Sequence, residues 1–312
     1  MHERILVTGG GGFIGSHMAA YLLARGVGVN VLDDFSSGST SNLEGLDGDL
    51  RVFEGSIVNP KDVAAAIDGV DGIFHFAALP SVARSVQEPV LTQEVNVTGT
   101  VALLDAARCK GVKMVFAGSS SAYGDQDVVA KNEDLKDMPI SPYAASKVAA
   151  EHYCRVFAKV YGLPVVITRF FNVYGPRQVP DNPYSGVVAA FCLALLEGRR
   201  PHIDGDGLQS RDFTYVEDIV RGCHAALETR LEGCPTINLA CGGSHTVMDL
   251  LVNLQEYADN PLEPSFGPAR EGDVRESCAD IARARQLLGF EPETSFSEGL
   301  RRTFEWYRES YK

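Results

Sequence analysis

The sequence predicts an α/β fold: a Rossmann-type, doubly wound parallel sheet with a smaller mixed C-terminal region that binds substrate. Short apolar runs, typical of strands buried on both faces, alternate with helical patterns up to about residue 170. A glycine-rich turn follows the first run, and beyond residue 170 the sequence becomes rich in turns. We therefore expect the sheet in residues 1–170 and the smaller region in residues 171–312, with no clean cut between them.

The composition restricts the partners of the chain. Lys and Arg number 28 against 41 Asp and Glu, and the net charge of −13 argues against nucleic acid or an anionic membrane as a partner. The seven cysteines include no C-x-x-C pair and the histidines show no metal-ligand spacing, so we expect reduced thiols, a cytoplasmic location and no metal site. The longest apolar run, residues 187–196, is too short to cross a bilayer, and no secretory signal is expected.

The N-terminal residues have the spacing of a dinucleotide-binding βαβ unit. A strand at residues 5–7 runs into Thr8-Gly9-Gly10-Gly11-Gly12-Phe13-Ile14-Gly15, followed by a helix at 16–25 and a strand at 27–32. Glycines let a pyrophosphate approach the backbone at a helix N-terminus, and Asp33 at the strand tip can bond ribose hydroxyls. Asp33 and Asp34, with no arginine beside them, favour NAD over NADP.

Further strand and helix patterns extend this unit along the chain. We expect strands at 51–55, 72–76, 113–117 and 165–168, and helices at 61–67 and 93–109. Ala77 and Ser119 follow two of these strands, and ligands gather at the carboxyl ends of strands in open parallel sheets. In the smaller region we expect helices at 187–198, 216–227, 247–257, 281–288 and 296–307, with short strands at 202–203 and 236–240.

One helix carries a candidate acid–base pair. Ser141 is a good N-cap and Pro142 suits the first helical position, so a helix is expected to start there. Tyr143 and Lys147 are four residues apart and share one face of it. A phenol beside an ammonium, near a helix N-terminus, should ionise more easily than a free tyrosine. By itself the pair also fits a surface tyrosine packed on a lysine stem.

Several motifs now stand in order along nearly the whole chain. Beyond the glycine turn and Tyr143-x-x-x-Lys147, they are His75-Phe76-Ala77-Ala78, Ser119-Ser120-Ser121-Ala122-Tyr123-Gly124, Arg169-Phe170-Phe171-Asn172-Val173-Tyr174-Gly175-Pro176, Gly205-Asp206-Gly207, Arg211-Asp212-Phe213 and Arg270-Glu271-Gly272-Asp273. With them the chain resembles the extended short-chain dehydrogenase/reductase family. Within that family it is similar to UDP-sugar 4-epimerases of the UDP-glucose and UDP-N-acetylglucosamine type.

The resemblance implies a role for each group. Tyr143 would be the base for the sugar 4-hydroxyl, Ser119 would bond O4, and Lys147 would bond the nicotinamide ribose and hold Tyr143 ionised. Residues implied in NAD binding are Gly9, Gly12, Phe13, Ile14, Gly15, Asp33, Asp34, Ser56, Ile57, Phe76, Ala77, Ala78, Asn96, Tyr143 and Lys147. Those implied in UDP-sugar binding are Ser81, Ser120, Ser121, Asn172, Val187, Val188, His202, Arg211, Arg270, Asp273 and Ser277.

The implied reaction is reversible 4-epimerisation of a UDP-hexose through a 4-keto sugar, with tightly held NAD regenerated in each cycle. A homodimer through the helices at 93–109 and 143–160 is also implied. Ser277 corresponds to the position near the sugar C2 substituent, and its small side chain would leave space for an N-acetyl group. Ser56-Ile57 departs from the Asp-Ile or Asp-Val that usually contacts adenine in the family.

Other functions remain open at this point. A UDP-glucuronate 4-epimerase or decarboxylase is the nearest alternative, because the sequence does not show what contacts C5. A sugar 4,6-dehydratase is disfavoured, since Ser119-Ser120-Ser121 stands where those enzymes carry Thr-Asp-Glu for proton transfer. A non-catalytic NAD-binding regulator is also less favoured, because Ser119, Tyr143 and Lys147 are all present.

Overall fold

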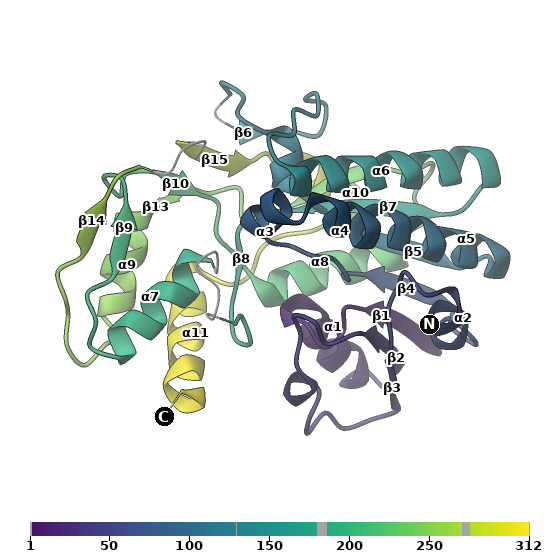
Figure 1. Cartoon of the computed structure of the whole chain (residues 1–312), viewed down its shortest axis with the longest axis horizontal. Coiled ribbons are helices and arrows are strands. Elements are labelled where there is room, and N and C mark those ends of the chain that lie inside the picture. Colours follow the sequence, from purple (N-terminus) through teal and green to yellow (C-terminus); the bar gives the residue numbers. More distant parts are fainter. Residues whose placement is uncertain (1, 129, 180–185, 270–274, 312) are drawn as a thin grey trace.

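The computed structural model describes residues 2–128, 130–179, 186–269 and 275–311, and its centre is a parallel sheet (Figure 1). Among these residues seven strands pair in the order β12-β7-β5-β4-β1-β2-β3, all parallel. Their bounds are β1 (Arg4–Thr8), β2 (Gly28–Asp33), β3 (Leu50–Glu54), β4 (Gly72–His75), β5 (Lys113–Ser119), β7 (Val165–Phe170) and β12 (Thr236–Leu239). The order reverses between β1 and β4, as in a doubly wound Rossmann-type sheet.

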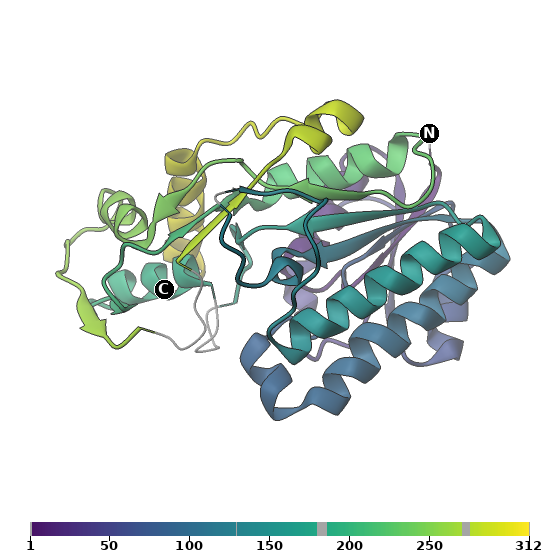
Figure 2. The same cartoon turned by 90° about the horizontal axis from the view of Figure 1, so that it is seen from above.

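Helices cover both faces of this sheet. One face packs on α2 (Pro60–Ala66), α5 (Thr100–Lys110) and α6 (Pro142–Tyr161), and the other on α1 (Phe13–Leu23), α8 (Val216–Glu228) and α10 (Ala282–Leu288). Figure 2 shows α5 and α6 side by side on one side of the strands and α8 on the other. Successive residues of β5 divide between the two cores: Met114 and Phe116 join the first, and Val115 joins the second. Strand β5 is thus apolar on both sides, which explains its apolar run in the sequence.

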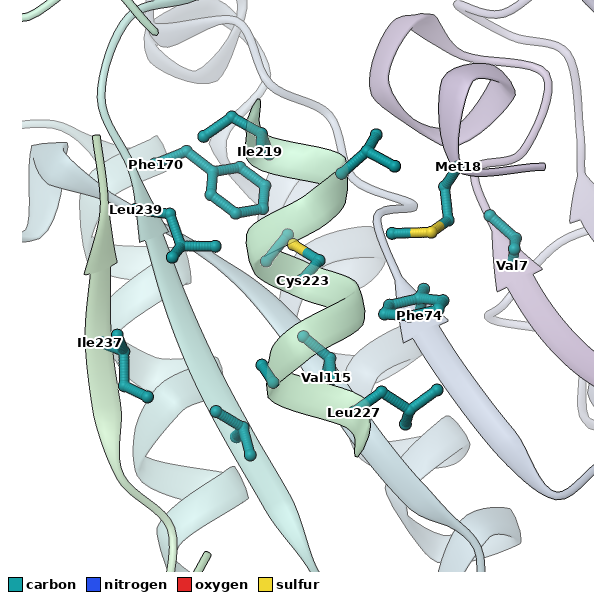
Figure 3. Packing of buried hydrophobic residues seen from close by; sticks show 14 of the residues in the cluster. Val7, Met18, Phe74, Val115, Phe170, Ile219, Cys223, Leu227, Ile237 and Leu239 are labelled. Carbon is teal, nitrogen blue, oxygen red and sulfur yellow. The ribbon is translucent and has the colours of Figure 1, made fainter. Parts of the chain in front are cut away.

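Two elements from beyond residue 170 belong to this sheet layer. Strand β12 pairs with β7 along Ile237↔Thr168, and α8 packs across β5. In Figure 3 Ile219, Cys223 and Leu227 of α8 point into the core between the sheet and α1. Residues 171–312 therefore contribute to the seven-stranded sheet and its helices as well as to the smaller region. The division into two folding units stays a prediction.

The smaller region has its own core. Helices α7 (Val187–Leu196), α9 (Val247–Gln255) and α11 (Phe296–Ser310) pack together around a third apolar cluster. Its short strands are β8 (Val173–Tyr174), β9 (His202–Asp204), β10 (Ser210–Arg211), β11 (Thr214–Tyr215), β13 (His245–Thr246), β14 (Ser265–Gly267) and β15 (Glu276–Ala279), and β15 also pairs with β6 (Ala130–Lys131). These strands form one four-stranded and two two-stranded sheets among the described residues.

Several elements differ from the sequence-based expectations. The helix expected at 93–109 is a series of α4 (Pro89–Gln93), a π-helical segment (Glu94–Gly99) and α5. Sequence periodicity does not reveal a π segment, because a single wider turn inside an α-helix is too short to change the pattern of the whole helix. Short elements that were not expected are η1 (Thr40–Asn42), α3 (Val82–Gln87) and η3 (Ser120–Tyr123). Of the helices in the described part of the chain, none combines the length and apolarity needed to cross a bilayer.

Candidate active site

The turn between β1 and α1 brings backbone unusually close to backbone. Gly9 has a φ of 70°, and a Cβ there would lie 2.6 Å from the backbone N of Ala77. A Cβ at Gly15 would lie 2.1 Å from the carbonyl oxygen of Gly9. Glycine is therefore required at both positions. Gly12 is the N-cap of α1 and provides no capping side chain, so the first N–H groups of the helix are left for a ligand.

Asp33 ends β2 and is fixed beside this turn. Its Oδ2 accepts a hydrogen bond from the Gly11 N–H at 2.8 Å, and its Oδ1 accepts one from the Phe35 N–H at 2.8 Å. Burial raises the pKa of Asp33, and the two N–H groups lower it part of the way back. A carboxylate has about four lone-pair positions, so the side chain keeps acceptors for ribose hydroxyls.

A cavity of about 770 Å³ lies along this edge of the sheet. It is lined by almost all of the residues expected to bind NAD: Gly9, Gly12, Phe13, Ile14, Gly15, Asp33, Asp34, Ser56, Ile57, Phe76, Ala77, Ala78, Tyr143 and Lys147. Ser81, expected at the sugar, lines it too, and its Oγ caps α3 by accepting from the Arg84 N–H at 3.1 Å. The structure thus places the residues expected to bind the dinucleotide and the expected acid–base pair around one cavity.

Asn96 does not line this cavity, although we expected it beside the cofactor. Its side-chain amide lies on the π-helical segment and is buried. It bonds both the N–H and the C=O of Leu79, at 2.8 and 3.2 Å, and donates to Ser146 Oγ at 3.0 Å. The neighbouring Val95 lines the cavity instead. Asn96 therefore supports the cavity wall and the first turns of α6.

The start of α6 is held from three sides. The Ser141 hydroxyl accepts from the Ala144 N–H at 3.1 Å, as the sequence predicts for an N-cap. The Tyr143 N–H donates to the buried Ser85 Oγ of α3 at 3.0 Å, and Ser146 Oγ donates to the Tyr143 carbonyl at 2.7 Å. These contacts fix the backbone from which the phenol projects.

Ser119 and Tyr143 are joined by a hydrogen bond. Ser119 Oγ also accepts from Ser121 Oγ at 2.8 Å and from the Ser121 N–H at 3.2 Å. Because that oxygen already accepts two hydrogen bonds, its own proton is available for the Tyr143 oxygen. Ser120 follows in the η3 turn, and none of the three serines lines the cavity of about 770 Å³.

The expectation that Tyr143 ionises easily is wrong for the chain alone. Burial raises the pKa of Tyr143, and the Ser119 hydrogen bond lowers it only in part. The Lys147 ammonium bonds elsewhere: its Nζ donates to the Ala117 carbonyl at 3.0 Å and lies 5.1 Å from the Phe116 ring centroid. Desolvation of the phenol therefore outweighs the ammonium and the helix N-terminus, the two effects on which the sequence-based argument rested. Burial also lowers the pKa of Lys147 to about 8.

A second cavity, of about 310 Å³, adjoins the first. Both are lined by Asn172, Val173, Gln178 and Gly186. The second is also lined by Val187, Val188, His202 and Arg211, all expected at the UDP moiety. The His202 side chain is largely exposed, and its Nδ1 lies 3.1 Å from Ser265 Oγ. The structure thus places the expected UDP residues next to the expected NAD residues.

Ser277 lies on a strand rather than a helix, directly beside Arg211. Strands β10 and β15 pair in register Arg211↔Ser277, and the Ser277 carbonyl accepts from the Asp212 N–H at 2.8 Å. Asp212 is fully buried, and its carboxylate accepts from the N–H groups of Cys241, Gly242 and Ala279. Burial raises the pKa of Asp212 to about 6. Arg270 and Asp273 lie outside the described residues.

Comparison with known proteins identifies the family. Residues 5–240 match the sequence model of the NAD dependent epimerase/dehydratase family. The UDP-glucose 4-epimerase of Mycolicibacterium smegmatis is 41% identical over 313 residues, which span 98% of each chain. The chain belongs to this family.

Solved structures agree with this assignment. A UDP-N-acetylglucosamine 4-epimerase from Methanobrevibacter ruminantium, in complex with UDP-N-acetylmuramic acid, matches with a TM-score of 0.94 and 34% identity over 98% of each chain. A UDP-glucuronic acid 4-epimerase from Bacillus cereus, in complex with UDP-glucuronic acid and NAD, matches with a TM-score of 0.90 and 32% identity over 98% of this chain and 99% of that one. Both of these structures are of UDP-sugar 4-epimerases, and they differ in the sugar.

The residues of this epimerase fit NAD. The glycine turn forms a cradle that a Cβ at Gly9 or Gly15 would fill, and the uncapped N-terminus of α1 suits a pyrophosphate. Asp33 suits a ribose diol, and it would repel a 2′-phosphate. At the expected adenine position, the Ser56 N–H donates to Asp62 Oδ2 of α2 at 2.9 Å. The Asp62 carboxylate thus contacts the backbone of Ser56, but Asp62 does not line the cavity.

The sequence-based argument missed several residues of the site. Asn42 lines the first cavity and donates to the Gly11 carbonyl at 2.9 Å, and Gln178 lines both cavities. Asn42 ends the short helix η1, which was not expected, and Gln178 lies in a loop whose path the sequence does not define. Ser85 and Glu151 support α6, and only Glu151 carried a signal: it is four residues beyond Lys147, on the same helical face.

Proposed function

We propose that this epimerase interconverts UDP-glucose and UDP-galactose and also accepts their N-acetylated forms. The main support is the arrangement of the two cavities: the Tyr143 phenol opens on one, Arg211 lines the other, and Asn172 belongs to both. A hexose on a diphosphate tether would reach from Arg211 to Tyr143 across that shared wall. A guanidinium is well suited to hold a phosphate oxygen pair.

In this proposal Tyr143, Ser119 and Lys147 each have one task. When bound, NAD supplies the hydride acceptor and donor at sugar C4. Tyr143 takes the proton of the sugar 4-hydroxyl and later returns it, and Ser119 donates a hydrogen bond to the oxygen that carries the negative charge. The Lys147 ammonium, fixed on the Ala117 carbonyl, favours the phenolate through its charge. Arg211 and Asn172 hold the diphosphate while the keto sugar turns.

Acceptance of N-acetyl sugars rests on Ser277. It is half-buried next to Arg211, and we propose that it lies near the sugar C2 substituent. Ser277→Tyr should reduce epimerisation of UDP-N-acetylglucosamine more than about tenfold and spare UDP-glucose, because only the larger sugar needs that space. Ser277→Ala should keep both activities. Equal N-acetyl activity in wild type and Ser277→Tyr would contradict the assignment.

A UDP-glucuronate 4-epimerase or decarboxylase is the second candidate. Arg84 lines the same cavity as Tyr143 and could meet a sugar carboxylate. However, its Nε donates to Glu88 at 2.6 Å, which offsets much of its charge. A panel of UDP-hexoses, UDP-N-acetylhexosamines and UDP-glucuronate, each tested for its 4-epimer and for CO₂ without added NAD, separates these functions. Preference for UDP-glucuronate would favour the second candidate, and no product with any sugar would favour a regulator.

We also propose a homodimer and a reducing, cytoplasmic setting. Helix α6 exposes Tyr153, Val156 and Val160 on its outer side, an apolar surface that a second copy would cover. All seven cysteines are free thiols, as expected in a reducing compartment. Light scattering of wild type and Val160→Glu tests the first point, since a charge at the interface should shift the mass to that of a monomer.

A further inference from the structure

A buried ionic cluster lies directly behind the acid–base pair. Glu151 follows Lys147 by one turn of α6 and is 0% exposed. Its Oε1 accepts from Arg169 Nε at 2.9 Å, and its Oε2 accepts from Arg169 Nη2 at 2.6 Å and Arg155 Nη2 at 2.9 Å. Arg169 lies on β7, is 1% exposed and also bonds Asp137. A bidentate, charge-assisted pair of this kind is rigid.

The cluster packs against the end of β5, next to the proposed catalytic serine, Ser119. A Cβ at Gly118 would lie 2.8 Å from Glu151 Oε1, so the carboxylate occupies the space that any other residue would need. Gly118 stands between Ala117, whose carbonyl accepts from Lys147 Nζ, and Ser119. The ammonium and the carboxylate are therefore neighbours on one helix face, and they meet two adjacent residues of β5, Ala117 and Gly118.

We propose that Glu151 is a positioning residue, which keeps the Lys147 ammonium in its charged form and directed at the end of β5. The inference rests on the acid–base role proposed for Tyr143 and Lys147. A buried cation one turn from a fixed carboxylate is stabilised by it, because little water screens the pair. The role of the two arginines is then to fix the carboxylate, because both donate hydrogen bonds to it.

Other groups facing Lys147 do not take over this task. On α6 the Cys154 thiol has its pKa raised by burial, so it is neutral. On β4 burial lowers the pKa of His75 to about 3, so it is neutral above pH 5. On β5 Lys147 meets only the Ala117 carbonyl and the Phe116 ring. Among the described residues, Glu151 is thus the carboxylate that acts to raise the pKa of Lys147 against the effect of burial.

The test compares two variants with opposite expected signs. Glu151→Gln keeps the size of the side chain but leaves an excess of positive charge, so the alkaline limb of the kcat profile should move about one unit toward lower pH. Arg155→Gln removes a positive charge and leaves the Arg169 pair intact, so the limb should move toward higher pH. Its shift should be smaller, because Arg155 is one-third exposed.

A second measurement does not depend on activity. The free energy of unfolding of the holoenzyme is measured from pH 7 to 10 for wild type, Glu151→Gln, and both in a Lys147→Met background. Glu151→Gln should shift the pH at which stability begins to rise, and this shift should vanish in the Lys147→Met background. The inference would be overturned if the alkaline limb of the kcat profile stayed in place in both variants, or if it moved in the same direction in both. Inactivity of wild type on every UDP-sugar would instead refute the proposed function and leave the unfolding test intact.

Discussion

Replacing Lys147 with methionine should stabilise the protein near neutral pH while removing its activity. The ammonium is 4% exposed, and burial lowers the pKa of Lys147 from 10.5 to about 8. That depression corresponds to a cost of about 3 kcal/mol for keeping the charged form in the folded state. Methionine fills similar space without the charge but loses the hydrogen bond to Ala117, worth about 1 kcal/mol. The net gain at pH 7 is then about 2 kcal/mol.

The pH dependence of this gain is the decisive part. Because the folded pKa of Lys147 is the lower one, its contribution to stability is fully present above pH 10.5 and is lost as pH falls toward 8. Wild type should therefore gain about 1.4 kcal/mol per pH unit relative to Lys147→Met above pH 8, and the two should be equally stable near pH 9.5. Urea unfolding of both cofactor-free proteins at pH 7, 8, 9 and 10 measures this. A difference that does not change with pH, or a wild type that is more stable at pH 7, would refute the reasoning.

Three further predictions concern the site and its support. His75 lies between Thr8 and Thr100, and burial lowers its pKa to about 3. The free energy of unfolding should therefore fall by about 1.4 kcal/mol per pH unit as pH drops below 6.5. Acid unfolding of His75→Gln should lack this slope. Gly9→Ala should abolish measurable NAD binding in calorimetry, whereas Gly26→Ala, at a similar positive φ but in open space, should cost only about 1 kcal/mol of stability and bind NAD normally. Tyr143→Phe should lower kcat by about 10² to 10⁴ and retain NAD, and wild-type turnover in this variant would exclude the phenol as the base.

The sequence predicted the sheet and the cofactor edge well, because both follow from local patterns. The apolar run of β1, the glycine turn and Asp33 lie within one βαβ unit, and their spacing determines their contacts. Elements that depend on tertiary packing were less accessible. The π-helical segment Glu94–Gly99 looks like α-helix in the sequence, and the pairing of β12 with β7 joins residues that are 69 positions apart.

The sequence predicted which residues form the candidate site, but it did not predict the directions in which their pKa values shift. Ser119 and Tyr143 do meet, yet the direction of the Tyr143 pKa depends on how much water the fold removes from the phenol. The same holds for Lys147, whose partner is a backbone carbonyl that no sequence pattern marks. Glu151 and Arg169 are charged residues in apolar surroundings, and only their mutual contact explains how they can be buried.

The position of β12 has a consequence for the order of folding. Strand β12 pairs with the edge of β7 that no other strand covers, and α8 covers the part of the core that α1 does not reach. The sheet is therefore complete only when residues near 239 have been added. A nascent chain that ends at residue 170 would expose the whole edge of β7 together with Phe74, Val115 and Val166. The ribosome must add about 70 further residues, several seconds of synthesis, before that edge is protected. During this interval the growing chain is the form of the protein most in need of a chaperone.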